Sequence, residues 1–532
     1  MTTLTGAGTL IRLALRRDRL MLAVWLYAFA AFVGATVYGF RGLYPTAAAR
    51  AEFARTANGN PALLSLYGPL YGSSLGSFTA WRDVTVCALL AGLMSVFLVV
   101  RHTRAEEEAG RLELVGAAVV GRHAPLAAVA SVAAGANAAV AAVMAAVAAA
   151  LGLPAAGSVA LAAGVAACGL ATASVAAVTA QLARSARTAR GLAIGVLGAA
   201  FLLRAVGDSV SRTGPRWLTW LSPVGWAELI RSFDGTRWWT LALPLALAAA
   251  AAAAAALLAR RRDYGAGVLA GRPGRAAAGR ALASPLGLAW RLQRASLLSW
   301  AGGALVYGVV IGSASRGIGG LYGSAQVRRA MAELGGRAGL VDAFLAAMVL
   351  FAGLAVAGFA ISAVLRLRSE EAGQRADAVL ATAVSRTGWA LSHLVIAAAG
   401  AAAILLAAGL GLGVGAGAQS GGLGHQIARM TGAGIAELPA VLVMAGIAVA
   451  LLGLRPRIGA IVSWSALGLV VALAFVGAIL RLSHWVLDAS PFTHLPKLPG
   501  GTVSATPLAA LSAVAAALGA AGLAGLRRRD IG

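Results

Sequence analysis

Charged residues are scarce in this sequence, and one of the four common types is almost missing. Of its 532 residues only 12% are charged and 60% are hydrophobic, and Lys497 is the one lysine among 44 basic residues. An average soluble domain has about 25% charged and about 45–50% apolar residues. The composition therefore excludes a soluble globular domain and indicates a membrane protein.

The sequence also lacks the motifs of several kinds of active site. It contains no Gly-x-x-x-x-Gly-Lys-Ser/Thr phosphate loop, since Lys497 lies between prolines. The six histidines are scattered, without the HExxH or Cys/His spacing of zinc sites. Asp208, Asp234 and Asp488 do not form a spaced catalytic pair. We therefore expect no catalytic residue, no metal and no bound cofactor, which predicts that the chain is not an enzyme.

Cysteine usage and net charge point to no further partner class. Cys87 and Cys168 both fall in apolar runs, where we expect thiols packed between helices. The net charge of +25 comes almost entirely from arginines that stand in short groups between apolar runs. Such groups follow the positive-inside rule of membrane proteins, so we expect no nucleic-acid partner.

Long apolar runs fill most of the chain. A helix needs about 20 apolar residues to cross about 30 Å of hydrocarbon, and only helices or closed barrels pair every backbone amide there. The runs are continuous and rich in Ala and Leu, which favours helices. We predict an all-α, polytopic integral membrane protein with about twelve spans. They are expected roughly at 20–39, 83–100, 125–152, 158–182, 190–206, 239–259, 297–315, 343–365, 389–416, 437–454, 458–480 and 505–526.

The two halves of the sequence repeat one another. Residues 107–110 read Glu-Glu-Ala-Gly, and residues 370–373 read the same, 263 positions later. Each tetrad follows two arginines and precedes a further one, Arg122 or Arg386. The repeat predicts two fused six-helix units, 1–263 and 290–532, joined by a cytoplasmic linker at 264–289. A fused pair suggests a pseudo-twofold path between the halves.

The arginine groups predict how the chain lies in the membrane. If the N-terminus is cytoplasmic, every second loop is basic, and the short loop near Pro154 on the other side carries no charge. This alternation predicts a multi-pass protein of the plasma membrane, surrounded by lipid, with both termini in the cytoplasm.

Acidic residues gather in the loop after the second span of each half. Carboxylates on the cytoplasmic side work against the positive-inside bias. One explanation is a solvated loop with helical pairs such as Glu107 with Arg111. The second copy favours another explanation, a short charged helix that docks on a partner.

The chain resembles the membrane-spanning permease of an ABC exporter, of the actinobacterial polyketide-antibiotic (tetronasin-transport) type. The resemblance covers nearly the whole chain and rests on the duplicated layout and on residues 107–113, 222–226 and the Arg-Arg-Arg-Asp ends. It implies that these loops couple the permease to an ABC ATPase subunit, in two copies, which binds ATP. The implied coupling residues are Glu107, Glu108, Arg111, Glu113, Glu370, Glu371 and Asp377. In the second copy Gln374 is taken to stand where Arg111 stands, which suggests a weaker or differently charged contact.

A Ser-Pro pair precedes the last span of each half. Ser222, Pro223 and Trp226 have Ser490 and Pro491 as their counterparts, amid several tryptophans. The resemblance implies short re-entrant helices at the outer exit of the path, whereas an ordinary aromatic belt is the alternative. Inside the spans, Asn137 is expected to make a hydrogen bond between helices, and Arg204 to extend toward the interface.

The expected function is ATP-driven export of a hydrophobic or amphiphilic small molecule, with ATP hydrolysis on a separate subunit. The alternative is a twelve-helix transporter driven by an ion gradient. That mechanism needs protonatable groups inside the membrane. The acids of this chain cluster in loops, and essentially none is expected inside a span, which favours the ATP-driven exporter.

Overall fold

The fold is helical throughout the part of the chain that the structure describes. The computed structural model describes residues 3–59, 61–112, 118–209, 216–262, 265, 267–268, 277, 279–321, 336–476 and 483–529. All regular elements in these ranges are α- or 3-10 helices. Twelve of them are long and apolar enough to cross a membrane. The predicted all-α class with about twelve spans is confirmed.

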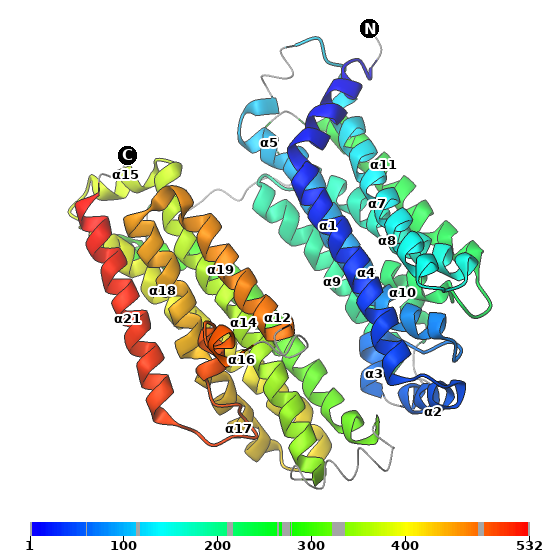
Figure 1. The fold of residues 1–532 in the computed structure, drawn as a ribbon. Coiled ribbons are helices and arrows are strands. Elements are labelled where there is room, and N and C mark those ends of the chain that lie inside the picture. Colours follow the sequence, from blue (N-terminus) through cyan, green and yellow to red (C-terminus); the bar gives the residue numbers. More distant parts are fainter. Residues whose placement is uncertain are drawn as a thin grey trace. The chain divides into compact units, whose positions relative to one another are not determined.

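The chain divides into two compact units, Met1–Gly274 and Arg275–Gly532. Figure 1 shows each unit as a bundle of long helices. The expected linker spans 264–289, and most of its first part lies outside the described residues. Its last part is already structured, because η3 (Arg280–Ala283) forms there and the next helix begins at Pro285.

Unit 1 is built on six long helices. They are α1 (Ala7–Leu43), α4 (Leu75–His102), α7 (Ala124–Ala150), α8 (Ala155–Leu182), α9 (Ala186–Ser209) and α11 (Ala242–Arg261). The core lies around α4 and α8, whose apolar windows are the most buried of this unit. Both cysteines are buried there, as expected. Asn137 on α7 donates to Ser95 Oγ on α4 at 2.9 Å, which confirms the predicted bond between helices.

Short helices cover the two ends of unit 1 (Figure 1). One end holds α5 (Arg104–Glu108) and the end of α11, and we call it the loop end. The other, the short-helix end, holds α2 (Ala47–Asn58), α3 (Pro61–Tyr67), η1 (Arg216–Leu221), α10 (Pro223–Leu229) and η2 (Trp238–Leu241). The sequence did not predict α2 and α3, because both are too short to give a membrane signal and α2 is also polar.

Unit 2 repeats the six long helices with local differences. They are α12 (Pro285–Leu321), α14 (Gly336–Ala372), α16 (Arg386–Ser420), α18 (Leu438–Leu454), α19 (Pro456–Val476) and α21 (Ala505–Arg528). Its loop end holds α15 (Arg375–Leu380), and its short-helix end holds α20 (His484–Leu487) and η4 (Pro491–His494). An additional helix, α17 (Leu423–Ala436), precedes α18 and packs along α16.

Glycines bring α21 very close to α18. A Cβ atom at Gly453 would overlap the carbonyl oxygen of Gly522, so only glycine fits there. Small residues allow such close approach between membrane helices. The packing fixes where α21 ends, at the loop end of unit 2, and so places the arginine that follows it.

Candidate functional site

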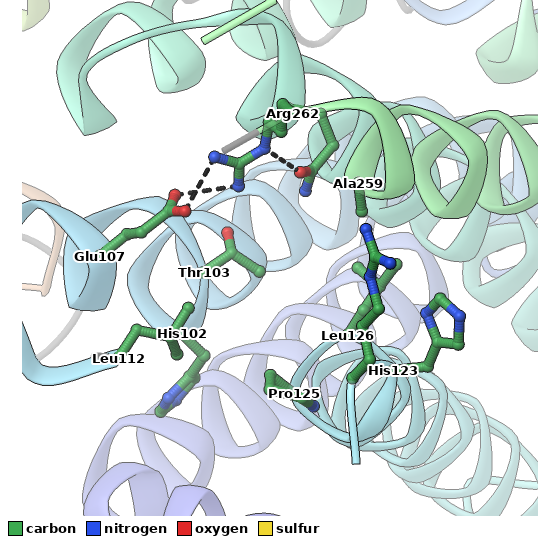
Figure 2. A pocket seen from close by; sticks show the side chains of 11 residues that line it. His102, Thr103, Glu107, Leu112, His123, Pro125, Leu126, Ala259 and Arg262 are labelled. Atoms are coloured by element: carbon green, nitrogen blue, oxygen red, sulfur yellow. Dashed lines mark hydrogen bonds and ion pairs between the residues drawn. The ribbon is translucent and has the colours of Figure 1, made fainter. Parts of the chain in front are cut away.

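Glu107 lies at the centre of a buried ion cluster at the loop end of unit 1. Its side chain is only 3% exposed. Arg262, just after α11, places Nη1 2.8 Å from Oε1 and Nη2 3.0 Å from Oε2 (Figure 2). Arg104, one turn before Glu107 on α5, donates to Oε2 at 2.5 Å. Two guanidinium groups more than offset the charge of this one carboxylate, which lets it lie in the interior.

The neighbouring glutamates of α5 lie nearer the surface. Glu106 accepts hydrogen bonds from Arg111 at 2.7 and 3.1 Å and from Arg17 of α1 at 2.9 Å. Glu108 is exposed and accepts from the backbone N–H of Ala186 at 3.0 Å, at the first residue of α9. A carboxylate is favourable there, because the N–H groups of a helix start carry partial positive charge. Arg111 therefore pairs with Glu106 and not, as expected, with Glu107.

The loop of unit 2 repeats this arrangement. Glu371, 5% exposed, accepts from Arg529 Nη2 at 2.5 Å, and Arg368 lies 3.5 Å from its other oxygen. Glu370 accepts from Arg366 Nε at 2.8 Å and from Arg375 Nε at 2.7 Å. Each unit thus has one glutamate tied to the arginine beyond its last helix, and one tied to the arginine that follows the loop turn.

These contacts correct the alignment of the two repeats by one residue. Glu107 and Glu371, 264 positions apart, have corresponding partners: the arginine three residues before and the arginine beyond the last helix. Glu106 and Glu370, also 264 positions apart, both pair with the arginine that follows the loop turn. The turn agrees, because Gly110 and Gln374 both have a left-handed backbone, at φ +70° and +53°. The prediction that Gln374 replaces Arg111 is therefore wrong.

The counterpart of Arg111 is Arg375, and the same register pairs Glu113 with Asp377. Glu113 lies outside the described residues. Asp377 is exposed in the first turn of α15. The second loop thus has the same charges as the first at these positions. The sequence therefore no longer indicates that the second loop binds its partner more weakly or through different charges.

The residues expected to couple to an ATPase divide into exposed and buried ones. Among the described residues, the exposed charged surface of the two loops is formed by Glu108, Arg111, Arg375 and Asp377. Glu107 and Glu371 do not reach that surface. Contact with an ATPase stays a prediction for all of them.

A small cavity of about 100 Å³ lies beside the Glu107 cluster (Figure 2). Its lining includes Arg122, His123, Gln181 and Arg262. Drug-sized ligands occupy cavities of about 300–1,000 Å³, so this cavity cannot hold one. A larger cavity, about 430 Å³, lies in unit 2 between α17 and the start of α21, and its lining is mostly apolar.

The Ser-Pro pairs begin short helices at the short-helix end of both units. Ser222 caps α10, where its Oγ accepts from Gly225 N at 3.2 Å and donates to Ala200 O of α9 at 2.6 Å. Ser490 caps η4 and accepts from Phe492 N at 3.3 Å. Pro223 and Pro491 occupy the first helical position, where a missing N–H costs least.

Tryptophans surround these short helices. Trp226 of α10 donates to Trp220 O at 2.5 Å, and Trp220 stacks on Trp239 with 5.7 Å between ring centroids. Trp239 and Trp485 are well exposed. Exposed tryptophans suit an aromatic belt as well as an exit element, so both interpretations stay open.

Arg204 does not extend toward an interface, and this expectation is wrong. Its side chain is fully buried, and its Nη2 donates to the carbonyl oxygens of Ser65 and Leu66 at 2.6 and 2.9 Å. Its Nη1 lies 3.4 Å from Glu228 Oε2 of α10 and 3.6 Å from Asp208 Oδ2. The arginine instead fastens α3 and α10 to the end of α9.

Glu228 shares this guanidinium with a second carboxylate. Burial raises the pKa of the Glu228 carboxyl well above its usual range, Asp208 raises it further, and Arg204 opposes the rise. Two carboxylates beside one guanidinium favour a proton on one of them. Gly68 makes room for Glu228, because a Cβ atom at that glycine would overlap the carboxylate.

Two of the expected spans contain a buried acid, contrary to the expectation that essentially none does. Asp83 on α4 is fully buried and accepts from Thr36 Oγ1 of α1 at 2.7 Å. Glu437, between α17 and α18, is 7% exposed. Both residues stand at the first position of an expected span, 83–100 or 437–454. In a sequence, an acid at a span boundary looks like part of a loop, although the helices here continue beyond it.

The geometry defines a multi-pass membrane protein: two bundles of membrane-length helices, with a charged loop at one end of each and short helices at the other. A family model described as "Multidrug efflux system permease Rv1217c, C-terminal domain" matches residues 8–261 and 282–527. The multidrug efflux system permease protein Rv1217c of Mycobacterium tuberculosis (strain ATCC 25618 / H37Rv) is 42% identical over 530 residues. That match covers 99% of this chain and 95% of the relative. The chain belongs to the family of this efflux permease.

Proposed function

We propose that this chain is the plasma-membrane permease of an ATP-driven exporter, with both termini in the cytoplasm. Its substrates are hydrophobic or amphiphilic small molecules, polyketide antibiotics of the tetronasin type among them. A separate ABC ATPase subunit, in two copies, binds and hydrolyses ATP. The observation that carries the proposal is the duplicated loop, which presents the same charged groups once in each unit.

Two further observations support the proposal. The relative that is 42% identical is named a multidrug efflux permease. The cavity of about 430 Å³ in unit 2 has the size and the apolar lining of a site for a drug-sized ligand. Helices rich in alanine and glycine, with few charges, suit a hydrophobic substrate better than an ion or a sugar.

One observation favours the second candidate, a transporter driven by an ion gradient. Asp83 and Glu437 are buried acids in membrane-length helices, and such groups are the usual proton carriers of gradient-driven transporters. They stand in different helices of the two units, so the repeat does not duplicate them. The charged loops, in contrast, are duplicated with their contacts. We therefore rank this function second.

The purified chain is expected to hydrolyse no ATP, because its sequence contains no phosphate loop. When affinity-purified from its own membranes in mild detergent, it is expected to bring down an ATPase subunit. The measurements are phosphate release by the isolated chain and mass spectrometry of the co-purified proteins. Phosphate release by the isolated chain, or repeated purification without an ATPase, would refute the proposal.

A further inference from the structure

In both units, the last residues of the repeat are bound to its first loop. Glu107 pairs with Arg262, 155 residues later, and Glu371 pairs with Arg529, 158 residues later. Each arginine follows directly on the last long helix of its unit, α11 or α21. The two pairs lie within separate units, so the structure contains the same connection twice.

Both connections are shielded from water. The side chains of Glu107 and Arg262 are 3% and 12% exposed, and those of Glu371 and Arg529 are 5% and 16% exposed. Charge pairs so little exposed are weakly screened by salt. They hold two elements together more firmly than surface pairs, which contribute only about 0–1 kcal/mol.

The third long helix of each unit reinforces the connection. Arg122, just before α7, donates to the carbonyl oxygen of Arg260 at 2.9 Å. Arg386, the first residue of α16, donates to the carbonyl oxygen of Arg529 at 2.9 Å. The end of the last helix is therefore bound on two sides, by the loop and by the helix that follows the loop.

The exposed and buried faces of each loop have different partners. The exposed charged surface faces outward, whereas Glu107 and Glu371 face the last helix. A partner that binds the outward face would act on the last helix through the buried pair. Most of the surface of α11 and α21 is free of the rest of the unit, since only 22% and 11% of their apolar windows are buried. Each of these two helices packs mainly on one neighbour, α8 or α18, so it can shift more easily than the core helices α4 and α14, which pack on several helices.

We propose that Arg262 and Arg529 are positioning residues that pass the movement of the ATPase-binding loop to the last helix of the same unit. This inference rests on the proposed function. Removing the two guanidinium groups uncouples hydrolysis from transport, while the outward face of each loop still binds the ATPase. Arg104 and Arg368 still neutralise the two glutamates in such a variant, so the loops keep their fold.

The test uses the permease–ATPase complex in proteoliposomes and compares two double variants. Arg262→Ala/Arg529→Ala removes the connection. Arg261→Ala/Arg528→Ala removes the same charge from exposed side chains at the same helix ends. We expect the first variant to keep the ATPase subunit and its basal hydrolysis, but to export about tenfold less substrate per ATP hydrolysed. The second is expected to match the unchanged protein.

Arg262→Gln/Arg529→Gln removes the same two charges but keeps more of the side-chain volume than alanine does, while Arg104 and Arg368 stay paired with the two glutamates. It is expected to lower export per ATP in the same direction, and it serves if the alanine variant is poorly folded. The inference would be overturned if neither of the two variants at Arg262 and Arg529 lowered export per ATP. So would loss of the ATPase subunit from the alanine variant, because the arginines would then only shape the docking surface. If the unchanged complex exports without ATP, the proposed function fails instead.

Discussion

Arg204→Met is expected to lower the free energy of unfolding by about 3–5 kcal/mol, the usual cost of removing one partner of a buried ion pair. Arg204 is fully buried, and its loss removes the guanidinium that Glu228 and Asp208 share. The substitution also removes both donors to the carbonyl oxygens of Ser65 and Leu66. Thermal unfolding of the detergent-purified protein measures the effect.

Two further variants show which interaction accounts for the stability lost in Arg204→Met. Arg184→Met removes an exposed arginine just before the same helix, and it is expected to leave the unfolding temperature unchanged. Glu228→Gln mimics the protonated acid, and because the pKa of Glu228 is raised, it is expected to cost much less stability than Arg204→Met.

The stability of the unchanged protein is expected to fall as the pH rises above the usual titration range of a glutamate. A group with a raised pKa contributes stability that is lost as pH rises through that pKa. Because Glu228 has a raised pKa, the Glu228→Gln protein should lose less stability than the unchanged protein under these conditions. An Arg204→Met protein as stable as the Arg184→Met control would contradict the role assigned to this cluster.

Reversing the exposed loop charges is expected to abolish efflux. Glu108→Arg/Asp377→Arg changes one exposed carboxylate in each loop and leaves the buried pairs of Glu107 and Glu371 intact. Juxtaposed like charges at an interface cost several kcal/mol, enough to lower binding of the ATPase about a hundredfold. The helices should still insert, because the proposed function places these loops in the cytoplasm, where added arginine agrees with the positive-inside rule. Co-purification of the ATPase and drug efflux from cells are the measurements.

The matched control places the same charge change at the short-helix ends. Glu52→Arg/Asp488→Arg reverses one exposed acid in each unit, on α2 and just after α20. It is expected to keep the ATPase subunit. If the loop variant also keeps the ATPase and its efflux, the loops are solvated surface and coupling lies elsewhere.

The long helices could be predicted from the sequence because the membrane fixes their length. An apolar run of about 20 residues is long enough for one helix that crosses the membrane. Each of the twelve expected spans overlaps a membrane-length helix of the structure. The short helices that begin at Ser222 and Ser490 were implied by the family resemblance, and their capping serines are of the residue type that favours a helix start.

The contacts of the charged residues could not be predicted in the same way. Arg262 and Glu107 are 155 residues apart, and nothing local in the sequence says that they meet. Identical Glu-Glu-Ala-Gly strings set the register of the repeat wrong by one, whereas the backbone aligns the turns at Gly110 and Gln374. The sequence hides the burial of Arg204 because its acidic partner Glu228 lies in a different element, α10.

Under the proposed function, a separate ATPase powers export through this chain. The most direct test is substrate transport in proteoliposomes that contain the chain with or without the co-purified ATPase subunit, supplied with ATP and treated with a protonophore. We predict transport only when both proteins and ATP are present, at a rate that the protonophore does not change. Transport by the chain alone, driven by an imposed proton gradient and abolished by Asp83→Asn or Glu437→Gln, would contradict the proposed function.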